Sequence, residues 1–380
     1  MYIMKKLSIF LAAVAATVGF VSCNKAVDNT PAAEQEELGG AIEVNINSIS
    51  ETKAASGDMK DFQINQVQVF VFDKATGRME TDKFVGGLTA NISTSVTLNT
   101  KTGAKVVYAL VNHPRLYLTP GTTGELLTNF EARLTDLSEN TAINLVMSGR
   151  NEINVVDVNR NGTAIAPQTM DVYVKRLVAR IQLDALKVDF RDGSLQDATF
   201  TVKEIYLKNV VGKSPIGVQG NTASAGSAIA PIVLPDTQYA VADNWYNKMR
   251  KVDGAPACVD DVYDQACTVA GAATAQNRVL FTFPNNTVED SNATSWNKRH
   301  TRLVIKAHVT KAAISIDKDT YYVLDLPVLA ANTVYEIKNV NITMLGKDDD
   351  NDDSNIDVGR FTPTITVDDW TGITELNYEF

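Results

Sequence analysis

Short segments that alternate apolar and polar residues recur along almost the whole chain, and they exclude most fold classes. A clear example is AIEVNINSI, residues 41–49, in which Ile42, Val44 and Ile46 alternate with polar residues. A period of two is typical of β-strands. Similar segments follow, separated by Gly, Asn and Asp turns: INQVQVFVFD, NISTSVTLNT, AKVVYALVN, AINLVMSG, EINVVDV, MDVYVKRLVARIQLDAL, FTVKEIYLKNV, VLFTFP, TRLVIKAHVT, YYVLDLPV and VYEIKNVNITML. Many short strands with turn-rich connections predict an all-β fold built of sandwiches.

One segment departs from this pattern. Between Gly121 and Leu137, apolar residues recur at helical spacing: Leu126, Leu127, Phe130, Leu134 and Leu137. We expect a single amphipathic helix there, with Thr122 or Thr123 as its N-cap. Its apolar stripe is expected to face the core.

The length of the chain favours about two domains, by the usual allowance of roughly 150 residues each. Hydrophobic residues make up 44% of the 380 residues and charged residues 21%, which is enough apolar material for a substantial core. Gly, Pro and polar residues cluster in NGTAIAPQT, residues 161–169. We therefore expect a first domain over residues 54–168 and a second over residues 169–380, with a long irregular stretch at 212–277.

The N-terminal residues have the pattern of a secretory signal. Lys5 and Lys6 precede an apolar run from Leu7 to Val21, and a polar tether follows. Cys23 stands where a bacterial lipoprotein signal peptidase would cut, so residues 1–22 are expected to be removed and Cys23 to carry a diacylglycerol. The alternative is an ordinary signal peptide that contains a cysteine.

Several functional classes are disfavoured by the composition and by the motifs. A net charge of −10 argues against nucleic acid or an anionic membrane surface as a partner. No catalytic motif is present, and His113, His300 and His308 have no metal-ligand spacing. The acidic run at 347–357 lacks the glycine and glutamate of an EF-hand, and we interpret it as a solvated linker. No catalytic residue, metal or cofactor is expected.

Two cysteines lie in the irregular stretch. Cys258 and Cys267 have eight residues between them. In an exported protein this spacing is compatible with a local disulfide, which would stabilise the fold by about 2–4 kcal/mol. Two free thiols are the alternative.

The C-terminal segment TITVDDWTGITELNYEF, residues 364–380, has two strand-like parts. Ile365 and Val367 alternate with threonines, and Leu376, Tyr378 and Phe380 alternate with polar residues. Such a segment either completes a sheet of its own chain or adds a strand to another subunit. The residues alone leave both interpretations open.

The order of several segments resembles the fimbrillins, the major subunits of type V pili in Bacteroidales. The resemblance covers essentially the whole chain and lies in a lipobox cysteine followed by NK, then AIEVNI, SETKAASG, VKRLVARIQL, YYVLDLPV, NTVYEIKNVNITMLG and TITVDDW. It implies two tandem transthyretin-like β-sandwich domains, in addition to the short helix expected in the first. It also implies a structural subunit without enzymatic activity.

The resemblance further implies maturation by proteolysis and assembly by strand exchange. Residues 23–53 would form a propeptide with a removable strand, and a trypsin-like surface protease would cut between Lys53 and Ala54. The family's known members are cut after arginine; Arg78 is the next basic candidate here, but it lies beyond the first core strand. A donor segment at 362–380 would then enter a neighbouring subunit through its apolar residues: Ile365, Val367, Trp370, Ile373, Leu376, Tyr378 and Phe380.

The implied partners and locations follow the same scheme. The precursor would be held in the outer membrane by its lipid and the mature form would lie in an extracellular fimbria that supports adhesion and biofilm formation. Its partners would be identical or related subunits in a homopolymer, the protease, and the anchor and tip proteins of the pilus.

Two other functions remain open. The chain is alternatively an anchor or tip subunit, which would keep its lipid or carry an added binding region. A surface lipoprotein that binds glycans is the second alternative, with Trp245, Tyr246 and Trp296 as stacking platforms.

Overall fold

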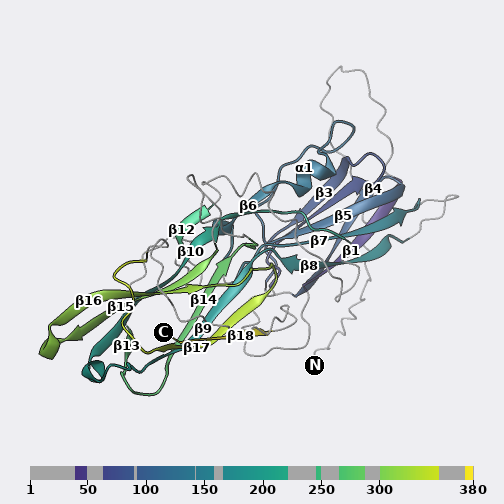
Figure 1. Ribbon diagram of the computed structural model, residues 1–380. Coiled ribbons are helices and arrows are strands. Elements are labelled where there is room, and N and C mark those ends of the chain that lie inside the picture. The colour runs from purple at the N-terminus through teal and green to yellow at the C-terminus, as the bar shows by residue number, and fades with distance from the viewer. Residues whose placement is uncertain are drawn as a thin grey trace, which may run out of the picture. The chain divides into compact units, whose positions relative to one another are not determined.

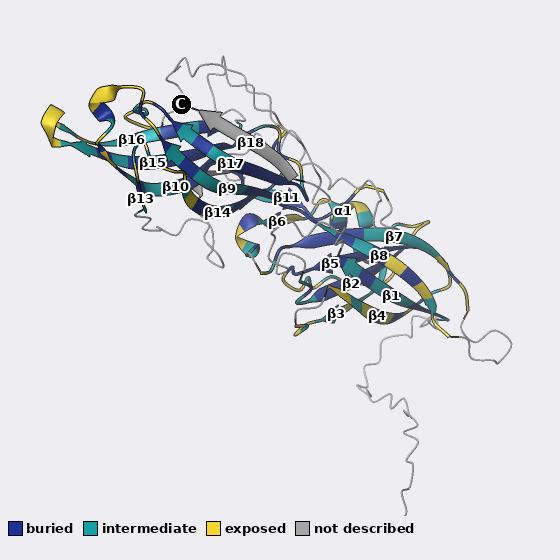
Figure 2. Ribbon diagram, turned by 90° about the horizontal axis from the view of Figure 1, so that it is seen from below, coloured by how far each residue is buried: buried dark blue, intermediate teal, exposed yellow. Residues whose placement is uncertain are grey.

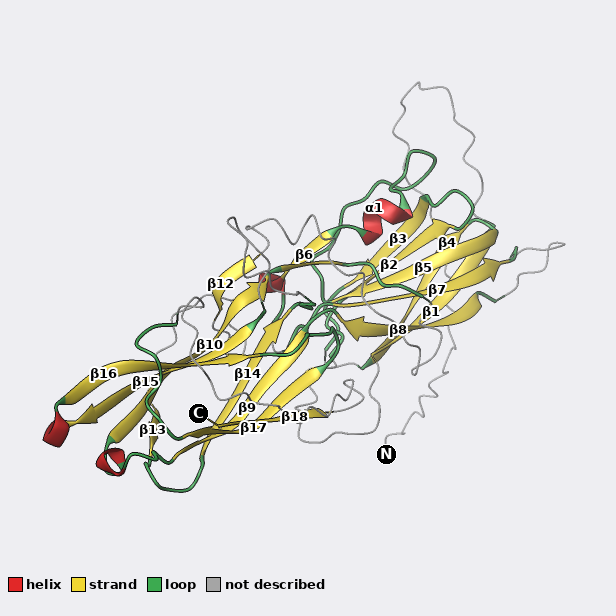
Figure 3. Cartoon of the chain, viewed as in Figure 1, coloured by secondary structure: helices red, strands yellow, loops and turns green. Residues whose placement is uncertain are grey.

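The computed structural model describes residues 39–48, 63–89, 92–141, 143–157, 166–220, 265–286 and 300–350, together with the backbone of 245–249 and 373–379. Almost every regular element in these ranges is a strand (Figure 3). No α-helix in the described part of the chain has the length and apolar character needed to cross a membrane. The expected all-β sandwich fold is confirmed.

The first sheet has seven strands in the order β3-β2-β5-β7-β8-β1-β4 (Figure 1). Its strands are β1 (Gly40–Ser48), β2 (Val67–Asp73), β3 (Met79–Val85), β4 (Ser93–Thr100), β5 (Gly103–Val111), β7 (Met147–Val155) and β8 (Gln168–Arg176). Only two residue pairs, Met147–Arg176 and Ser148–Lys175, join β7 to β8. The sheet turns over at this junction, where a Cβ on Gly149 would lie 2.2 Å from the carbonyl oxygen of Tyr173. Glycine is therefore required at position 149.

The two layers of this sheet enclose an aliphatic core. Buried residues of β2, β5 and β7 in one layer pack with those of β1, β4 and β8 in the other. Strands β2 and β5 are also buried on their opposite face, where Phe70, Phe72 and Tyr108 surround Phe130. The ring centroids of these three residues lie 4.7, 5.2 and 5.1 Å from that of Phe130. Buried residues dominate these strands in Figure 2.

The helix that carries Phe130 is much shorter than expected. The single short helix that we expect is present, but α1 has only five residues (Leu127–Glu131). Its N-cap is Leu126, without a side-chain hydrogen bond, so the expected bounds of 121–137 and the threonine N-cap are wrong. Leu134 opens a strand, β6 (Leu134–Asp136), and Leu137 opens a 3-10 helix, η2 (Leu137–Glu139). The cause is tertiary, because β6 pairs with β11 (Lys213–Pro215) from the second half of the chain.

The remaining strands form a second sandwich. They are β9 (Ala179–Val188), β10 (Thr199–Val211), β12 (Trp245–Met249), β13 (Gln265–Cys267), β14 (Thr274–Thr282), β15 (Arg302–Lys311), β16 (Ile316–Asp325), β17 (Val334–Ile342) and β18 (Ile373–Glu379), with the 3-10 helices η4 (Gly193–Leu195) and η6 (Ala312–Ile314). One sheet has the order β12-β10-β15-β16, with β13 also on β10, and the other has the order β14-β9-β17-β18. Apolar residues of both sheets, such as Phe200, Ile305 and Ile337, share one core.

The strand Gln168–Arg176 lies at the boundary that we expect between the two domains, 168/169. This strand, β8, pairs with β1 and β7 in the first sheet. Only Leu177 and Val178 separate it from β9. Both are buried in the core that also holds the aromatic cluster around Phe130. The division into two domains stays a prediction, and the change of sheets falls at 177–178.

The acidic run at 347–357 is anchored where it begins. Lys347 exchanges two backbone hydrogen bonds with Tyr321, at 2.8 and 2.9 Å. Asp348 pairs with Lys318 at 2.7 Å, and Asp350 accepts a hydrogen bond from the hydroxyl of Tyr206. The run is therefore attached to the second sandwich at Lys347 and Asp350, whereas Asp348 and Asp349 are exposed to solvent, as expected of a solvated segment. Residues 351–357 lie outside the described ranges.

Candidate functional site

Strand β1 is held by neighbours on both of its edges. It pairs antiparallel with β4 from Gly40–Thr100 to Asn47–Ser93, and parallel with β8 from Ile42–Gln168 to Ser48–Val174 (Figure 1). Its whole length is therefore hydrogen-bonded within the sheet. The sequence identified this strand but not its two neighbours, because a period of two shows which face is buried and not which strands pair.

The side chains of β1 alternate as the sequence predicts. Ile42, Val44 and Ile46 are completely buried in the aliphatic core. Glu43 and Asn45 on the other face are half-buried, and the amide of Asn45 donates to Asp171 of β8 at 3.1 Å. The strand thus contributes core residues on one face and polar contacts on the other.

Both ends of β1 fit closely against the sheet. A Cβ on Gly40 would lie 2.4 Å from Cγ1 of Val155 in β7, so a larger residue would displace the start of the strand. At the other end, the backbone N–H and the hydroxyl of Ser48 both donate to the carbonyl of Ile92, at 3.0 and 2.9 Å. These contacts fix the register of the strand.

The position of β1 in the chain separates it from the rest of its sheet. Every other strand of the first sheet follows the segment that contains Lys53 and Ala54, which lie outside the described residues. Scission there would leave β1 attached by non-covalent contacts alone. Burial of Ile42, Val44 and Ile46 contributes about 5–9 kcal/mol, at about 1.5–3 kcal/mol each. This is comparable with the whole stability of a domain, about 5–15 kcal/mol. A sheet that lost β1 would need another strand in its place.

Arg78, the other candidate for cleavage, lies in a tight turn between β2 and β3. The side chain of Asp73 accepts from the N–H of Thr76 at 2.8 Å, and Gly77 closes the turn with a positive φ of 68°. Nη1 of Arg78 donates to the carbonyl of Gly124 at 3.1 Å. A backbone held in this way does not fit easily into the extended form that proteases bind, which favours Lys53.

The C-terminal segment forms part of a sheet in the same chain. Strand β18 pairs parallel with β17, from Val334–Ile373 to Asn341–Glu379, and lies at the end of its sheet with one neighbour. The backbone is therefore used within the subunit, and the side chains of Ile373, Leu376 and Tyr378 are not described. Ile365, Val367, Trp370 and Phe380 lie outside the described residues.

Some of the other predicted residues are described by the structure, and others lie outside the described residues. Cys267 is buried and lies 3.9 Å from the amide nitrogen of Gln276. Burial raises the pKa of its thiol, and hydrogen bonds with Thr274 and Gln276 partly offset this. Cys23 and Cys258 lie outside the described residues, so lipidation and the disulfide stay predictions.

His113 lies 3.3 Å from Glu139, and His308 lies between Asp317 and Asp319 at 3.1 and 2.9 Å. Within the described ranges, no cluster of three or more metal-ligating side chains is found.

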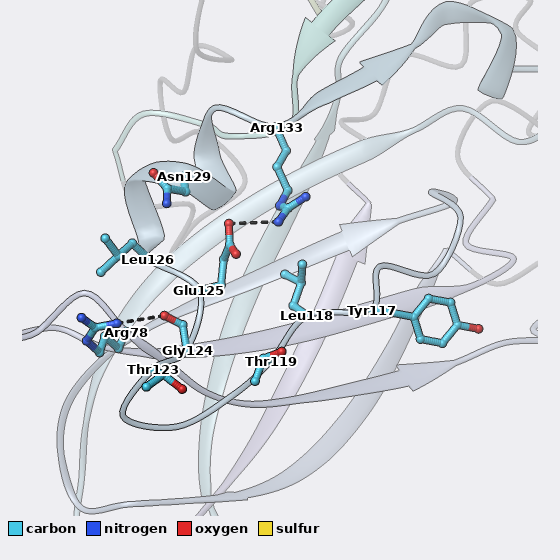
Figure 4. A pocket seen from close by; sticks show the side chains of 10 residues that line it. All are labelled: Arg78, Tyr117, Leu118, Thr119, Thr123, Gly124, Glu125, Leu126, Asn129 and Arg133. Carbon is cyan, nitrogen blue, oxygen red and sulfur yellow. Dashed lines mark hydrogen bonds and ion pairs between the residues drawn. The ribbon is translucent and has the colours of Figure 1, made fainter.

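A polar pocket of about 490 Å³ lies beside the turn of Arg78 and the start of α1. In Figure 4 its two arginines are engaged: Arg78 with the carbonyl of Gly124, and Arg133 with Glu125 at 3.1 Å. Tyr117 points away from this group in the same view. The pocket differs from the glycan platform predicted at Trp245, Tyr246 and Trp296. The side chains of Trp245 and Tyr246 are not described, and Trp296 is outside the described residues.

Comparisons with known proteins agree with this architecture. Residues 41–183 match the model of the major fimbrial subunit protein (FimA) family, so the matched region begins within β1. A fimbrilin (FimA) from Porphyromonas gingivalis is 19% identical, with 82% of this chain and 92% of that chain covered and a TM-score of 0.50. A candidate cell adhesion protein from Bacteroides eggerthii is 18% identical, with 90% and 98% covered and a TM-score of 0.53. The search of curated proteins finds no match.

The resemblance to the fimbrillins is thereby confirmed. At these identities the solved structures show that the fold is shared, and the family model relates residues 41–183 to the major fimbrial subunit proteins. Together they support a role as a structural, non-enzymatic subunit of a cell-surface fimbria.

The buried face of β1 gives a direct test of its contribution. Val44→Asp should lower the free energy of unfolding of the intact precursor by about 3–5 kcal/mol, because it places an unpaired carboxylate between Val96 and Met170. Glu43→Gln on the opposite face should change it by less than about 0.5 kcal/mol. Urea unfolding measures both. Equal stabilities would show that β1 is not part of the core.

Proposed function

We propose that this chain is a fimbrial subunit exported as a lipoprotein and polymerised by strand exchange at the β1 site. The observation that supports this most directly is that β1 fills the core of a sheet from which it is separated by the segment of Lys53. The protease removes the covalent link, β1 leaves, and the C-terminal segment of another subunit occupies the space between β4 and β8. The result is a homopolymer that serves adhesion and biofilm formation.

The lipid anchor belongs to the first stage of this scheme. Cys23 would carry a diacylglycerol that holds the precursor in the outer membrane until cleavage. Cys23→Ala should abolish incorporation of labelled palmitate and leave precursor inside the cell, whereas Cys258→Ala should be labelled normally. A labelled Cys23→Ala protein, or normal fibres made from it, would contradict the lipoprotein stage.

Proteolysis is the second stage, and the chain offers a matched control for it. Lys53→Ala should keep β1 covalently attached and prevent fibre formation, whereas Lys60→Ala changes the same residue type seven positions later and should assemble normally. N-terminal sequencing of the mature wild-type subunit should begin at Ala54. Recovery of AIEVNINSI in assembled fibres by mass spectrometry would contradict removal of the strand.

The sequence pattern of the donor segment supports the third stage. Ile365 and Val367 repeat the spacing and the side-chain types of Ile42 and Val44, which occupy adjacent core positions of β1. Thr366 lies between them and would face the opposite side of a strand. Leu376, Tyr378 and Phe380 alternate too, but their side chains are larger than those of β1. The pair Ile365 and Val367 is therefore the better fit to the β1 site.

Substitutions in this pair should separate assembly from folding. Ile365→Asp together with Val367→Asp should abolish the ladder of multimers on mildly denaturing gels, because two carboxylates would enter an apolar core. The melting temperature of the uncleaved precursor should stay within about 2 °C of wild type, since the core of its first sheet contains β1. Thr366→Asp should assemble normally. Ladders from the double variant would contradict donation by this pair.

The same experiments distinguish the alternative functions that the sequence leaves open. An anchor subunit would retain its lipid in the mature surface form and would not form the shaft of isolated fibres. A glycan-binding lipoprotein would bind polysaccharides through Trp245, Tyr246 or Trp296 and would form no ladder at all.

A further inference from the structure

Strand β4 depends on β1 for its backbone pairing. Among the described strands, β4 forms a ladder with β1 alone and stands at one end of the seven-stranded order, whereas β3 stands at the other end. If β1 leaves, as the proposed function requires, β4 loses this ladder. The space between β4 and β8 would be about 10 Å wide, two strand spacings, and β4 would form one of its walls.

Side-chain hydrogen bonds join β3 and β4, the strands at the two ends of the sheet order. Nζ of Lys83 on β3 donates to the carbonyl oxygen of Thr97 on β4 at 2.9 Å. The hydroxyl of Thr100 on β4 donates to Oε2 of Glu80 on β3 at 2.6 Å. The described residues show no backbone ladder between β3 and β4, so these links close the sheet through side chains.

The hydrogen bond between Thr100 and Glu80 belongs to a buried group of charged and polar side chains. Oε1 of Glu80 accepts from Nζ of Lys105 at 2.7 Å, and the side chain of Lys105 is only 1% exposed. Asp73 gives Lys105 a second carboxylate at 3.1 Å. Thr100 is completely buried. A buried ammonium group needs such partners, and their geometry holds Glu80 in place for Thr100. The far end of β4 is thereby connected to β3 and β5 without any contribution from β1.

We propose that Glu80, Lys83 and Thr100 form a clamp that holds β4 in position while the β1 site is empty, so that the site can accept a new strand. This inference rests on the proposed function, because it concerns the state between the loss of β1 and the entry of a donor. In the intact precursor β1 already fixes β4, and the clamp is of little consequence. In the emptied form, the clamp and the short link from Thr100 to Gly103 are what hold the end of β4.

The test compares strand uptake by the emptied subunit. The full-length precursor is cut with trypsin after Lys53, and a labelled peptide of residues 39–48 is supplied in excess to replace β1. The test variant is Lys83→Met with Thr100→Val, which removes both side-chain links and keeps the ion pair of Lys105 with Glu80. It leaves the longer contact of 3.4 Å from the backbone N–H of Lys101 to Oε2 of Glu80. Thr100→Ser keeps the hydroxyl and serves as the conservative variant.

A matched control removes a comparable lysine contact elsewhere. Nζ of Lys74 pairs with Glu152 of β7 at 2.5 Å and does not touch β4. Lys74→Met therefore changes the same residue type and also removes a contact to another strand.

The expected results differ between the intact and emptied forms. Wild type, Thr100→Ser and Lys74→Met should take up the peptide at similar rates, and the double variant at least tenfold more slowly. Amide hydrogen exchange in residues 93–100 should be at least tenfold faster in the emptied double variant than in emptied wild type. In the intact precursors it should be within about threefold. Lys83→Met alone, a change at an exposed side chain that keeps the core, should slow uptake at least threefold.

Three outcomes would overturn the inference, and they have different meanings. Equal uptake by wild type, Lys83→Met and the double variant would exclude the clamp and leave strand exchange intact. Failure of cleaved wild type to release β1 or to take up the peptide would exclude the removable strand, and the clamp with it. Faster exchange across all strands of the intact double variant would assign the two links a general structural role and would also contradict the clamp.

Discussion

The structure of the first sheet depends on one strand that precedes Lys53 in the chain, whereas every other strand of the sheet follows it. Two ladders and three buried aliphatic side chains hold β1 between β4 and β8. None of these contacts requires a covalent connection to β2. A strand of similar pattern supplied by another molecule would satisfy the same backbone groups and fill the same volume. The sheet therefore requires a strand with this residue pattern, which either the same chain or another molecule can supply.

The first sandwich is arranged so that loss of β1 would affect only one of its two cores. Strands β2 and β5 present Val67, Val69 and Val107 to the β1 side, and Phe70 and Tyr108 to the opposite side. The aromatic cluster around Phe130 therefore retains its contacts when β1 is absent. The hydroxyl of Tyr108 also donates to the carbonyl of Val218 at 3.1 Å, which joins this cluster to the second half of the chain. Burial, followed by the hydrogen bond and charge of Glu131, raises the pKa of Tyr108, so its hydroxyl remains a donor at neutral pH.

The sequence predicts what depends on local pattern and misses what depends on pairing between distant segments. The alternation of apolar and polar residues located β1 and its buried face. The helix was predicted too long because Leu134 and Leu137 kept helical spacing while their backbone pairs with residues 212–215. The pairing of β8 with β1 and β7 in the first sheet likewise has no local signal in the sequence. The hydrogen bonds that join Lys83 to β4 and Thr100 to β3 could not be predicted from the sequence either, because they are tertiary contacts between distant segments.

The number of neighbouring strands differs between the β18 position and the β1 position, and this difference would favour the proposed strand exchange. In its own chain β18 lies at a sheet edge with one neighbour, whereas the β1 position has two. In the proposed exchange, the segment of Ile365 and Val367 would gain two ladders and a buried face at the β1 position, and these gains would offset the ordering of its residues. While β1 is covalently attached, it competes for the position at a very high effective concentration, and a donor from another subunit cannot displace it. In the proposed scheme, cleavage would remove that advantage, and dilution of the released strand would make its return unfavourable. Cleavage at Lys53 would then determine when assembly begins, and the two ladders at the β1 position would stabilise the assembled state.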